Sequence, residues 1–334
     1  MIFIENEGIH DPHLNLALEE YALRNFNHGQ DYLLFYINKP SIIIGRNQNT
    51  LEEINHEYVE EKDIKVVRRI SGGGAVYHDF GNLSFSFITN YDHKSLNNFR
   101  KFTKPVIEVL NKMGVPAELK GRNDIVVNDK KVSGNAQFST VKRMFSHGTL
   151  LLDSDMGEVF NALNVKMSKI KSKGHKSAKS RVANISEFLD EPMDINTFRE
   201  KVLEGLYENR EEFETYHLTD EEWKGVHKLK KEKYDQWDWN YGKSPKFNIQ
   251  RENRFKVGEI DLRIFVEKGK IKDFTIYGDF FGRKPVSEIE EKLKGLRYRE
   301  SDIRGLLSEM DLKPYFGDID KEGFIKLVYG ADEN

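Results

Sequence analysis

The spacing of apolar residues predicts alternating strands and helices along most of the chain. Short apolar runs bounded by turn residues are typical of strands, and apolar residues that recur every three or four positions are typical of helices. In the first 240 residues we expect strands at 2–4, 32–37, 41–44, 64–70, 82–88 and 144–152, and helices from 11 onward and at 51–62, 98–113, 194–206 and 220–234. The first helix places Glu19 and Glu20 opposite its apolar face, as in a helix that packs on a core by one side.

The strand at 82–88 alternates strictly between two kinds of side chain. Its leucine and phenylalanine residues fall on one face, and Ser84 and Ser86 fall on the other. Because successive side chains of a strand point to opposite faces, one face is apolar and the other is small enough to lie under a ligand or a helix.

A run of three glycines at 72–74 separates the strands at 64–70 and 82–88. Glycine loses more conformational entropy on folding than other residues, so three together suit a sharp turn or the close approach of a ligand to the backbone. Arg68 and Arg69 directly precede the run. Together these residues indicate an anionic ligand.

A second polar cluster surrounds the turn at residues 128–129. Apolar segments flank this turn, which predicts a β-hairpin. The hairpin places Asn123 and Asp124 across from the segment that begins with Lys131. Lys130 points to the opposite face of that strand, and we expect it to face solvent.

The pattern changes near residue 240, where Trp237 and Trp239 interrupt the helical spacing. Beyond them the spacing predicts strands at 247–253, 259–266 and 271–277 and helices at 286–293 and 301–309. A length of 334 residues favours two domains. We therefore predict a large catalytic domain at 1–245 and a small α+β domain at 246–334.

Composition excludes several classes of function. The 52 Lys and Arg and the 55 Asp and Glu nearly cancel, to a formal net charge of −3, which gives no reason to expect a nucleic acid or a membrane as partner. The N-terminus lacks a basic stretch followed by an apolar core, and no apolar run is as long as a membrane span, so we expect a cytoplasmic protein. The absence of cysteine excludes disulfides, thiolate metal sites and catalysis through a cysteinyl thioester.

The segment at 166–181 is rich in lysine and contains almost no apolar residue. Two interpretations of such a segment are open. It is either a solvated loop without a function or a cationic flap that orders over an anion.

The residues of the two clusters suit nucleotide chemistry. The backbone N–H groups of a glycine-rich turn can hold an oxyanion, an arginine can bind phosphate, and Lys131 can neutralise charge between two anions. Asp124, next to Asn123, is a candidate Mg²⁺ ligand. Neither a Walker A motif nor Gly-x-Gly-x-x-Gly occurs, so the common P-loop and dinucleotide sites lose their main support.

Five motifs stand out in a fixed order. They are Arg-Arg-x-Ser-Gly-Gly-Gly-Ala-Val-Tyr-His-Asp-x-Gly-Asn-Leu at 68–83, Gly-Arg-Asn-Asp-Ile at 121–125, Lys-Val-Ser-Gly-x-Ala at 131–136, His-Gly-Thr-Leu-Leu at 147–151 and Lys-Ser-Arg-Val-x-Asn at 179–184. In sequence, order and spacing they resemble the motifs of the lipoate–protein ligase A family. The resemblance extends through a C-terminal accessory domain and covers nearly the whole chain.

The resemblance implies an α+β fold, with a mixed β-sheet catalytic domain of the type shared with biotin ligases and related to class II aminoacyl-tRNA synthetases. It also implies two half-reactions. Lipoate and ATP give lipoyl-AMP and pyrophosphate, and the lipoyl group then passes to a lysine of a carrier domain, in a 2-oxoacid dehydrogenase E2 subunit or the glycine cleavage H protein. The implied cofactors are ATP and Mg²⁺, with lipoate as substrate.

The resemblance also assigns roles to individual positions. Lys131 is the expected catalytic residue, in contact with both the lipoate carboxylate and the α-phosphate. The expected nucleotide or adenylate contacts are Arg68, Arg69, Gly73, Gly74, Ala75, Val76, Tyr77, Asn123, Asp124, Lys179, Arg181 and Asn184. The expected lipoate contacts are Lys131, His78, Gly74, Val76, Ser133, Gly134 and His147. Without the resemblance, His147 would be interpreted as a hydrogen-bonded core residue.

Other functions are known for proteins of this superfamily, and the motifs distinguish some of them from a lipoate ligase. Biotin ligases usually carry Gly-Arg-Gly-Arg-x-Gly, which is missing here, and octanoyl and lipoyl-amido transferases of this superfamily use a cysteine that this chain lacks. A lipoyl or octanoyl transferase that uses preformed acyl-AMP stays open. So does a non-enzymatic protein that binds lipoate or a nucleotide.

Overall fold

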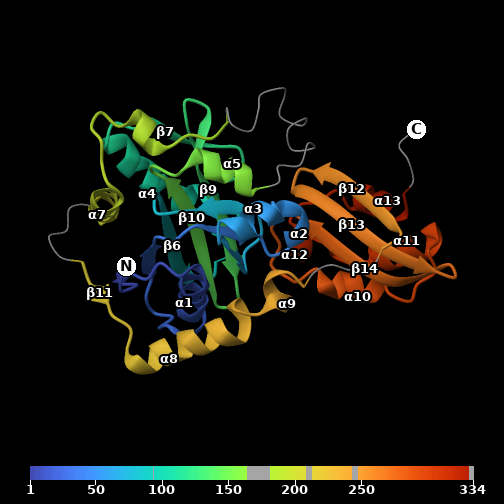
Figure 1. The fold of residues 1–334 in the computed structure, drawn as a ribbon. Helices are drawn as coiled ribbons and strands as arrows, with labels where there is room; N and C mark the ends of the chain where they lie inside the picture. The colour runs from blue at the N-terminus through green and yellow to red at the C-terminus, as the bar shows by residue number, and fades with distance from the viewer. Residues whose placement is uncertain (93, 164–180, 208–212, 243–246, 331–334) are drawn as a thin grey trace. The chain divides into compact units, whose positions relative to one another are not determined.

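The computed structural model describes the chain except for residues 93, 164–180, 208–212, 243–246 and 331–334 (Figure 1). Most of the lysine-rich segment, including Lys179, lies outside the described residues. Contacts divide the chain into two compact units. The large unit comprises Met1–Ile44, Glu52–Arg69 and Ala75–Asn240, and the small unit comprises Gly45–Leu51, Ile70–Gly74 and Tyr241–Asn334. The glycine run therefore belongs to the small unit, and the domain boundary at 245 stays a prediction.

The large unit is built on a mixed sheet of eight strands. Their order across the sheet is β11-β1-β2-β6-β10-β9-β8-β7. The strands are β1 Ile2–Ile4, β2 Tyr32–Tyr36, β6 Asn82–Asn90, β7 Ala117–Lys120, β8 Asp124–Val127, β9 Lys130–Ser139, β10 Arg143–Leu151 and β11 Thr215–Tyr216. The pairs β11–β1 and β1–β2 are parallel, and the other pairs are antiparallel. This mixed sheet, with its helices, confirms the α+β fold class.

A second sheet in the large unit has the order β4-β3-β5. It consists of β4 Lys65–Arg68, β3 Ser41–Ile44 and β5 Val76–His78, and the short β5 was not predicted. The single helix expected at 51–62 is wrong. Two helices, α2 Thr50–Glu53 and α3 His56–Glu61, replace it, because Ile54 forms a β-bridge with Leu163 and Asn55 caps the second helix.

The strand β6 presents two different faces, as its alternation predicts. Phe85 lies in a core with residues of α4 Phe99–Lys112 and α7 Ile195–Leu206. Burial of one phenylalanine side chain contributes about 1.5–3 kcal/mol. The serines point to the opposite face, where α1 Pro12–Asn25 packs on β6 and β10. The small side chains therefore leave space between the sheet and this helix.

Both glutamates of α1 are buried, at 1% exposure for Glu19 and 2% for Glu20. Glu19 faces the sheet, where it contacts His147 of β10, so the expectation that it lies opposite the packed side of the helix is wrong. Glu20 is covered because α8 Asp220–Leu229 and the π-helix η3 Lys230–Tyr234 pack along α1. Glu20 accepts hydrogen bonds from Lys233 Nζ at 2.7 Å and Tyr234 Oη at 2.6 Å. Burial alone would raise the pKa of the Glu20 carboxyl, but these two partners and Arg24 hold that pKa below its ordinary value.

The predicted hairpin is confirmed as β8 and β9. Asn128 and Asp129 form its turn with φ angles of 49° and 64°. A two-residue turn with two positive φ angles matches the right-handed twist of the strands, and asparagine and aspartate tolerate this conformation. Lys130 is exposed and pairs with Glu187 at 3.1 Å, as expected for the outer face of β9.

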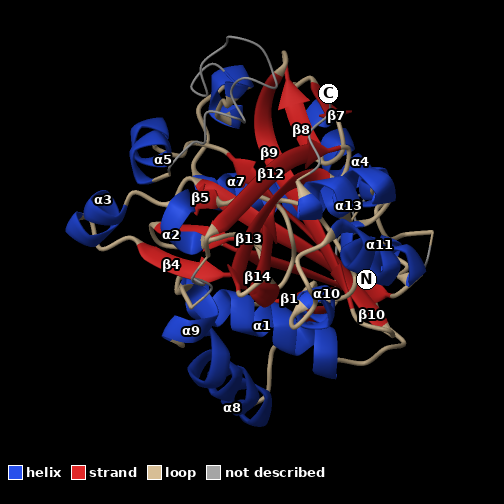
Figure 2. Cartoon of the chain, turned by 90° about the vertical axis from the view of Figure 1, so that its right-hand side faces the viewer, coloured by secondary structure: helices blue, strands red, loops and turns tan. Residues whose placement is uncertain are grey.

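The small unit contains a three-stranded antiparallel sheet, β12-β13-β14, together with helices (Figure 2). Apolar side chains of the sheet and the helices share one core. Its elements are β12 Ile249–Phe255, β13 Gly258–Glu267, β14 Lys270–Gly278, α10 Ser287–Leu293, α11 Glu300–Glu309, α12 Lys313–Phe316 and α13 Lys321–Tyr329. The predicted strands and the first two helices are confirmed. Within the part of the chain that the structure describes, no helix is long and apolar enough to cross a membrane.

Candidate functional site

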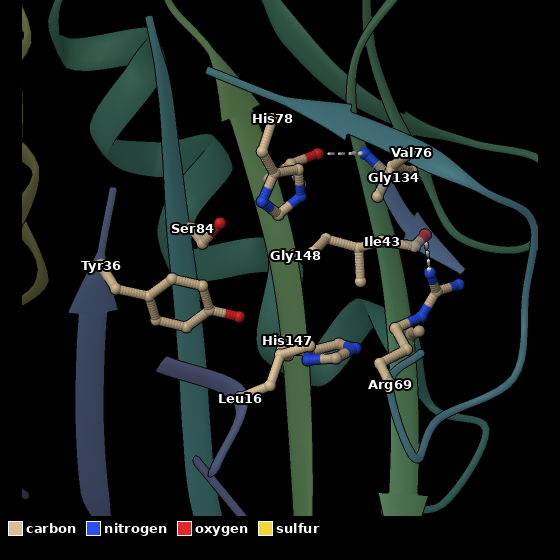
Figure 3. Close-up of a pocket in the computed structure, with 12 residues that line it drawn as sticks. Leu16, Tyr36, Ile43, Arg69, Val76, His78, Ser84, Gly134, His147 and Gly148 are labelled. Atoms are coloured by element: carbon tan, nitrogen blue, oxygen red, sulfur yellow. Dashed lines mark hydrogen bonds between the residues drawn. The ribbon is translucent and has the colours of Figure 1, made fainter. Parts of the chain in front are cut away.

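Four residues form a row across the centre of the large sheet. Tyr36 of β2 pairs with Ser84 of β6, and Ser84 pairs with Thr149 of β10. The N–H of Gly134 on β9 donates to Thr149 Oγ1 at 3.3 Å (Figure 3). Neighbouring strands lie about 4.8 Å apart, so this row is about 14 Å long. All four residues line one cavity.

The cavity lies between this row and a wall made by other elements of the large unit. Leu16 of α1, Ile43 of β3, and Val76 and His78 of β5 contribute to the wall (Figure 3). Its volume is about 40 Å³. Sites for small organic molecules are usually several times larger, so this space holds only part of such a ligand.

The ammonium group of Lys131 lies at the β9 end of the row. Lys131 Nζ lies 2.8 Å from Asp124 Oδ1, with the two side chains 36% and 26% exposed. Asp124 is the pairing partner of Gly134 across β8 and β9. A Cβ built on Gly134 would lie 2.9 Å from Lys131 Nζ. The lysine side chain therefore folds back over Gly134, and glycine at this position leaves it room.

We expect Gly134→Ala to lower the activity of the site without unfolding the protein. The new methyl group meets only the far end of a flexible lysine, which can swing away. A catalytic group displaced by about 1 Å can cost about 10²-fold in rate, and the turnover number, kcat, measures this loss. Gly305→Ala is the control, because a Cβ at Gly305 of α11 meets no atom within 4 Å. Normal kcat in Gly134→Ala would show that the position of Lys131 does not matter.

The chain that leaves the lysine-rich segment is anchored beside Lys131. Ala183 N donates to the carbonyl oxygen of Lys131 at 3.0 Å. The Asn184 amide accepts from Ser154 N at 3.0 Å and donates to Ser154 O at 2.9 Å. Asn184 therefore fixes the backbone here, and adenylate contacts of Asn184 and Arg181 stay predictions.

Two buried ionisable side chains, His147 and Arg69, also line the cavity. His147 Nδ1 lies 2.9 Å from Glu19 Oε1, and His147 lines the cavity. Arg69 Nη1 donates to Ile43 O at 2.9 Å. Burial lowers the pKa of Arg69 to about 10, although the nearby Tyr36 and Glu19 act in the opposite direction. Arg69 is thus a wall residue of this cavity, and its contact with a nucleotide stays a prediction.

His78 is the most deeply buried titratable group of the wall. Its side chain is 3% exposed and its Nδ1 lies 3.0 Å from Asn38 Nδ2. Burial lowers its pKa to about 3, and the nearby positive charge of Arg69 adds to that shift. The ring is therefore neutral near pH 7.

Arg68 forms hydrogen bonds away from the cavity, to residues 239 and 240. It is 2% exposed, and its Nε donates to Trp239 O at 2.9 Å. Trp239 Nε1 donates to Arg68 O at 2.8 Å, and Arg68 N donates to Asn240 Oδ1 at 2.9 Å. These bonds attach α9 Trp237–Asn240 to the end of β4, so Arg68 has a structural role, and its contact with phosphate stays a prediction.

Two further predicted residues, Asn123 and Ser133, form a structural group with Asn135 at the β8–β9 pair. Asn135 N and Asn135 Nδ2 both donate to Asn123 O at 3.0 Å. Asn135 Nδ2 also donates to Ser133 Oγ at 3.1 Å. Ser133 is fully buried and, as the neighbour of Gly134 on one strand, points to the opposite face from the cavity. A lipoate contact of Ser133 and a nucleotide contact of Asn123 stay predictions.

Each position of the glycine run at 72–74 favours glycine for a different structural reason. Gly73 has φ +94°, and a Cβ on Gly72 would lie 2.3 Å from the carbonyl oxygen of Phe280 in the same unit. A Cβ on Gly74 meets no atom within 4 Å, and Gly74 has no positive φ. Packing and conformation thus explain the first two glycines, whereas glycine at 74 is suited to a ligand that approaches the backbone.

The described residues contain no group of three or more His, Asp or Glu side chains that could hold a metal ion. Asp124 offers one carboxylate, and Lys131 already contacts it. Mg²⁺ commonly uses one or two protein carboxylates together with substrate phosphates. The donor set therefore fits Mg²⁺ only as a partner of a nucleotide, and the metal stays a prediction.

The sequence did not reveal two residues of the site, Tyr36 and Glu19. The local sequence predicts that Tyr36 is one more residue of an apolar strand and that Glu19 is a surface carboxylate. No local signal distinguishes them, because Tyr36 reaches the cavity only through strand pairing and Glu19 reaches the lining residue His147 only through the packing of α1 on the sheet.

The large unit has a mixed-sheet α+β fold with a small cavity beside the ammonium group of Lys131. Comparison with known proteins specifies the class of the protein. The family model of the lipoyl protein ligase A/B catalytic domain matches residues 11–207, and that of the bacterial lipoate protein ligase C-terminus matches residues 244–328. The chain is 56% identical over 331 residues to the lipoate-protein ligase LplJ of Bacillus subtilis, covering 98% of this chain and 100% of that protein. The chain belongs to the lipoate–protein ligases, a family of ligase enzymes.

Solved structures agree with this assignment. The crystal structure of P. falciparum LipL1 in complex with lipoate has a TM-score of 0.79 at 26% identity, covering 99% of this chain and 98% of that one. A lipoate-protein ligase A bound with ATP has a TM-score of 0.60 at 29% identity, with 70% and 94% covered. A bipartite ligase from Thermoplasma acidophilum, described with its E2 lipoyl domain, has a TM-score of 0.64 at 29% identity, with 74% and 98% covered.

Proposed function

We propose that this protein activates lipoate with ATP and transfers the lipoyl group to a lysine of a lipoyl-carrier domain. The observation that carries the proposal is the ammonium group of Lys131, held by Asp124 at the β9 end of the row. Membership of the lipoate–protein ligases supports it, as do relatives described with lipoate, with ATP and with an E2 lipoyl domain. The acyl chain would lie across the strands, with its carboxylate at Lys131 and its far end towards Tyr36.

In the first half-reaction a carboxylate oxygen of lipoate attacks the α-phosphorus of ATP. The bond from that phosphorus to the bridging oxygen breaks, and pyrophosphate leaves. Two anionic groups must approach each other in this step, and a fixed ammonium between them stabilises the negative charge as it concentrates. In this proposal Lys131 provides that charge once the incoming carboxylate competes with Asp124 for it.

In the second half-reaction the ε-amine of a carrier lysine attacks the lipoyl carbonyl carbon. The bond to the AMP oxygen breaks, AMP leaves, and the amine loses a proton to give the amide. The carriers we propose are 2-oxoacid dehydrogenase E2 subunits and the glycine cleavage H protein. The absence of cysteine supports direct transfer, because no thioester intermediate on this chain is available.

Mg²⁺ would neutralise part of the charge of the triphosphate during the first half-reaction. Asp124 would hold it together with the phosphates of the nucleotide. Lys131 would then contact the substrate carboxylate in place of Asp124.

Replacement of Gly74 by alanine is expected to raise KM for ATP or lipoate about tenfold, because an added methyl group overlaps a ligand at the backbone. The melting temperature should hardly change, since a Cβ at this position meets no protein atom within 4 Å. Steady-state kinetics and thermal melting measure the two effects. A normal KM for both substrates would remove Gly74 from the binding site.

The direct test is incubation of the protein with ATP, Mg²⁺, lipoate and a panel of lipoyl-domain acceptors, followed by the intact mass of each acceptor. We expect one acceptor to gain the mass of one lipoyl group, with release of AMP and pyrophosphate. No gain on any acceptor, with or without Mg²⁺, would contradict the proposal.

One alternative is a transferase that uses preformed lipoyl-AMP or octanoyl-AMP but activates the free acid poorly. The same cavity and the same Lys131 would serve it. Lipoate-dependent exchange of pyrophosphate into ATP separates the two, because only the ligase forms the adenylate itself. A non-enzymatic binding protein would show neither exchange nor acceptor modification.

A further inference from the structure

A short turn at residues 45–48 directly follows β3 and lies beside the glycine run at 72–74. Two hydrogen bonds join its first and last residues. Gln48 N donates to Gly45 O at 3.1 Å, and Gly45 N donates to Gln48 Oε1 at 2.8 Å. Gln48 is 2% exposed. The buried glutamine side chain therefore holds the 45–48 turn in one conformation.

Backbone hydrogen bonds attach the 45–48 turn on two sides. Arg46 N donates to Ser71 O at 2.9 Å, directly before the glycine run. Gly278 N, at the end of β14, donates to Asn47 O at 2.8 Å. All these residues belong to the small unit. The turn and the glycine run are therefore joined within one compact unit.

Gly45 and Gly73 lie in direct backbone contact. A Cβ built on Gly45 would lie 1.9 Å from the carbonyl oxygen of Gly73 and 2.9 Å from its carbonyl carbon. Real Cβ atoms do not approach other atoms so closely, so only glycine fits at position 45 unless the backbone moves. Gly45 has no positive φ angle. The close approach of the two backbones, and not the conformation of the turn, thus requires glycine here.

This contact also orients the N–H group of Gly74. The carbonyl of Gly73 and the N–H of Gly74 belong to one planar peptide group. Every peptide bond of the described residues is trans, and in a trans peptide the C=O and N–H bonds point in opposite directions. With its oxygen against Gly45, this peptide group directs the N–H of Gly74 away from the 45–48 turn.

We propose that Gly45 and Gln48 are positioning residues that fix the peptide group between Gly73 and Gly74, so that the Gly74 N–H donates to an anionic oxygen of the substrate. This inference rests on the proposed function for the presence of that substrate. A donor that is already held in its final direction loses little freedom when the anion binds, so binding is tighter. Gln48 acts through Gly45, and Gly45 acts through Gly73.

The test measures the binding of ATP and of lipoate to the full chain by titration calorimetry. Gly74→Ala identifies which of the two substrates contacts this backbone. We expect Gln48→Met to raise the Kd of the same substrate about tenfold. Methionine keeps the length of the side chain, but its sulfur is only a weak acceptor for the Gly45 N–H. In the double variant we expect no further loss beyond Gly74→Ala, because both changes act on one peptide group.

Gln137→Met is the matched control for Gln48→Met. Gln137 of β9 is 5% exposed, and its Oε1 accepts from Asn97 N at 2.7 Å. This variant therefore loses the same kind of buried hydrogen bond outside the glycine run. We expect a lower melting temperature in both variants but unchanged Kd values in Gln137→Met. An equal loss of binding in both would mean that Gln48 acts only through stability, and would overturn the inference.

Other results would also overturn it. These are an unchanged Kd in Gln48→Met, additive losses in the double variant, or normal binding of both substrates by Gly74→Ala. The ligand-free wild-type protein should give one Gly74 amide signal in a ¹⁵N-glycine spectrum. A doubled signal would mean that the peptide group has two orientations, and this measurement needs no variant that must fold. If the variants are coupled as expected but the wild type supports no pyrophosphate exchange, the proposed function fails while this inference stands.

Discussion

Replacement of Lys131 by alanine is expected to lower lipoate-dependent ATP–pyrophosphate exchange by about 10³-fold. Lys131 Nζ is the cation at the β9 end of the row, and in the proposed reaction it lies between the carboxylate and the α-phosphate. Its removal leaves the negative charge of the transition state without a fixed counter-charge. The fold should persist, because the lysine side chain is 36% exposed and contributes nothing to the apolar core.

Lys130→Ala is the matched control for this variant. Lys130 has the same charge and lies on the same strand, but it points outward and pairs with Glu187. Surface ion pairs contribute about 0–1 kcal/mol, so its loss should leave exchange unchanged. Near-normal exchange in Lys131→Ala, with an unchanged melting temperature, would exclude Lys131 as the catalytic residue. An equal loss in both variants would indicate a general effect of charge instead.

The second large effect concerns the stability of the protein in mild acid. The pKa of His78 is about 3 in the folded protein, against an ordinary value of 6.5. The unfolded chain therefore binds a proton at a pH where the folded protein does not. The stabilising contribution of neutral His78 is complete above pH 6.5 and is lost as the pH falls from 6.5 towards 3. Between about pH 7.5 and about pH 4.5 this single group should reduce the free energy of unfolding by about 2–3 kcal/mol.

Urea unfolding of the wild-type protein and His78→Phe across this pH range measures the effect. The difference between the two proteins isolates His78, because the other titrating groups are common to both. We expect the free energy of unfolding to fall more steeply in the wild type as the pH decreases. Parallel curves would mean that His78 titrates normally in the folded protein and is not held neutral by burial.

Much of the secondary structure follows from local sequence. The alternation around Ser84 predicted the two faces of β6 because side-chain direction in a strand has a period of two. The turn at Asn128 and Asp129 was predictable because these residues tolerate positive φ. The failed prediction has a long-range cause. The helix expected at 51–62 is split because Ile54 pairs with Leu163, a residue more than a hundred positions away.

The candidate site was predictable only in part. Lys131 and Gly134 were predicted as site residues because they lie in one short motif that resembles a motif of the family. Arg68 and Asn184 belong to motifs too, yet their side chains bind backbone groups of Trp239 and Ser154. A motif indicates that a residue matters but does not distinguish a ligand contact from an anchor, since both depend on partners elsewhere in the chain.

The sequence by itself determined the order of the strands and helices, the turn of the β8–β9 hairpin, the absence of a cysteine mechanism and the family of the chain. Tertiary structure alone decided that Tyr36, Ser84, Thr149 and Gly134 form one row, that α1 buries its glutamates and that the ring of His78 lines the cavity and contacts Asn38. The physical reason is that local periodicity specifies the direction of each side chain within its own element. The register between strands far apart in the chain, and the buried hydrogen bonds between distant side chains, exist only once those elements have packed together.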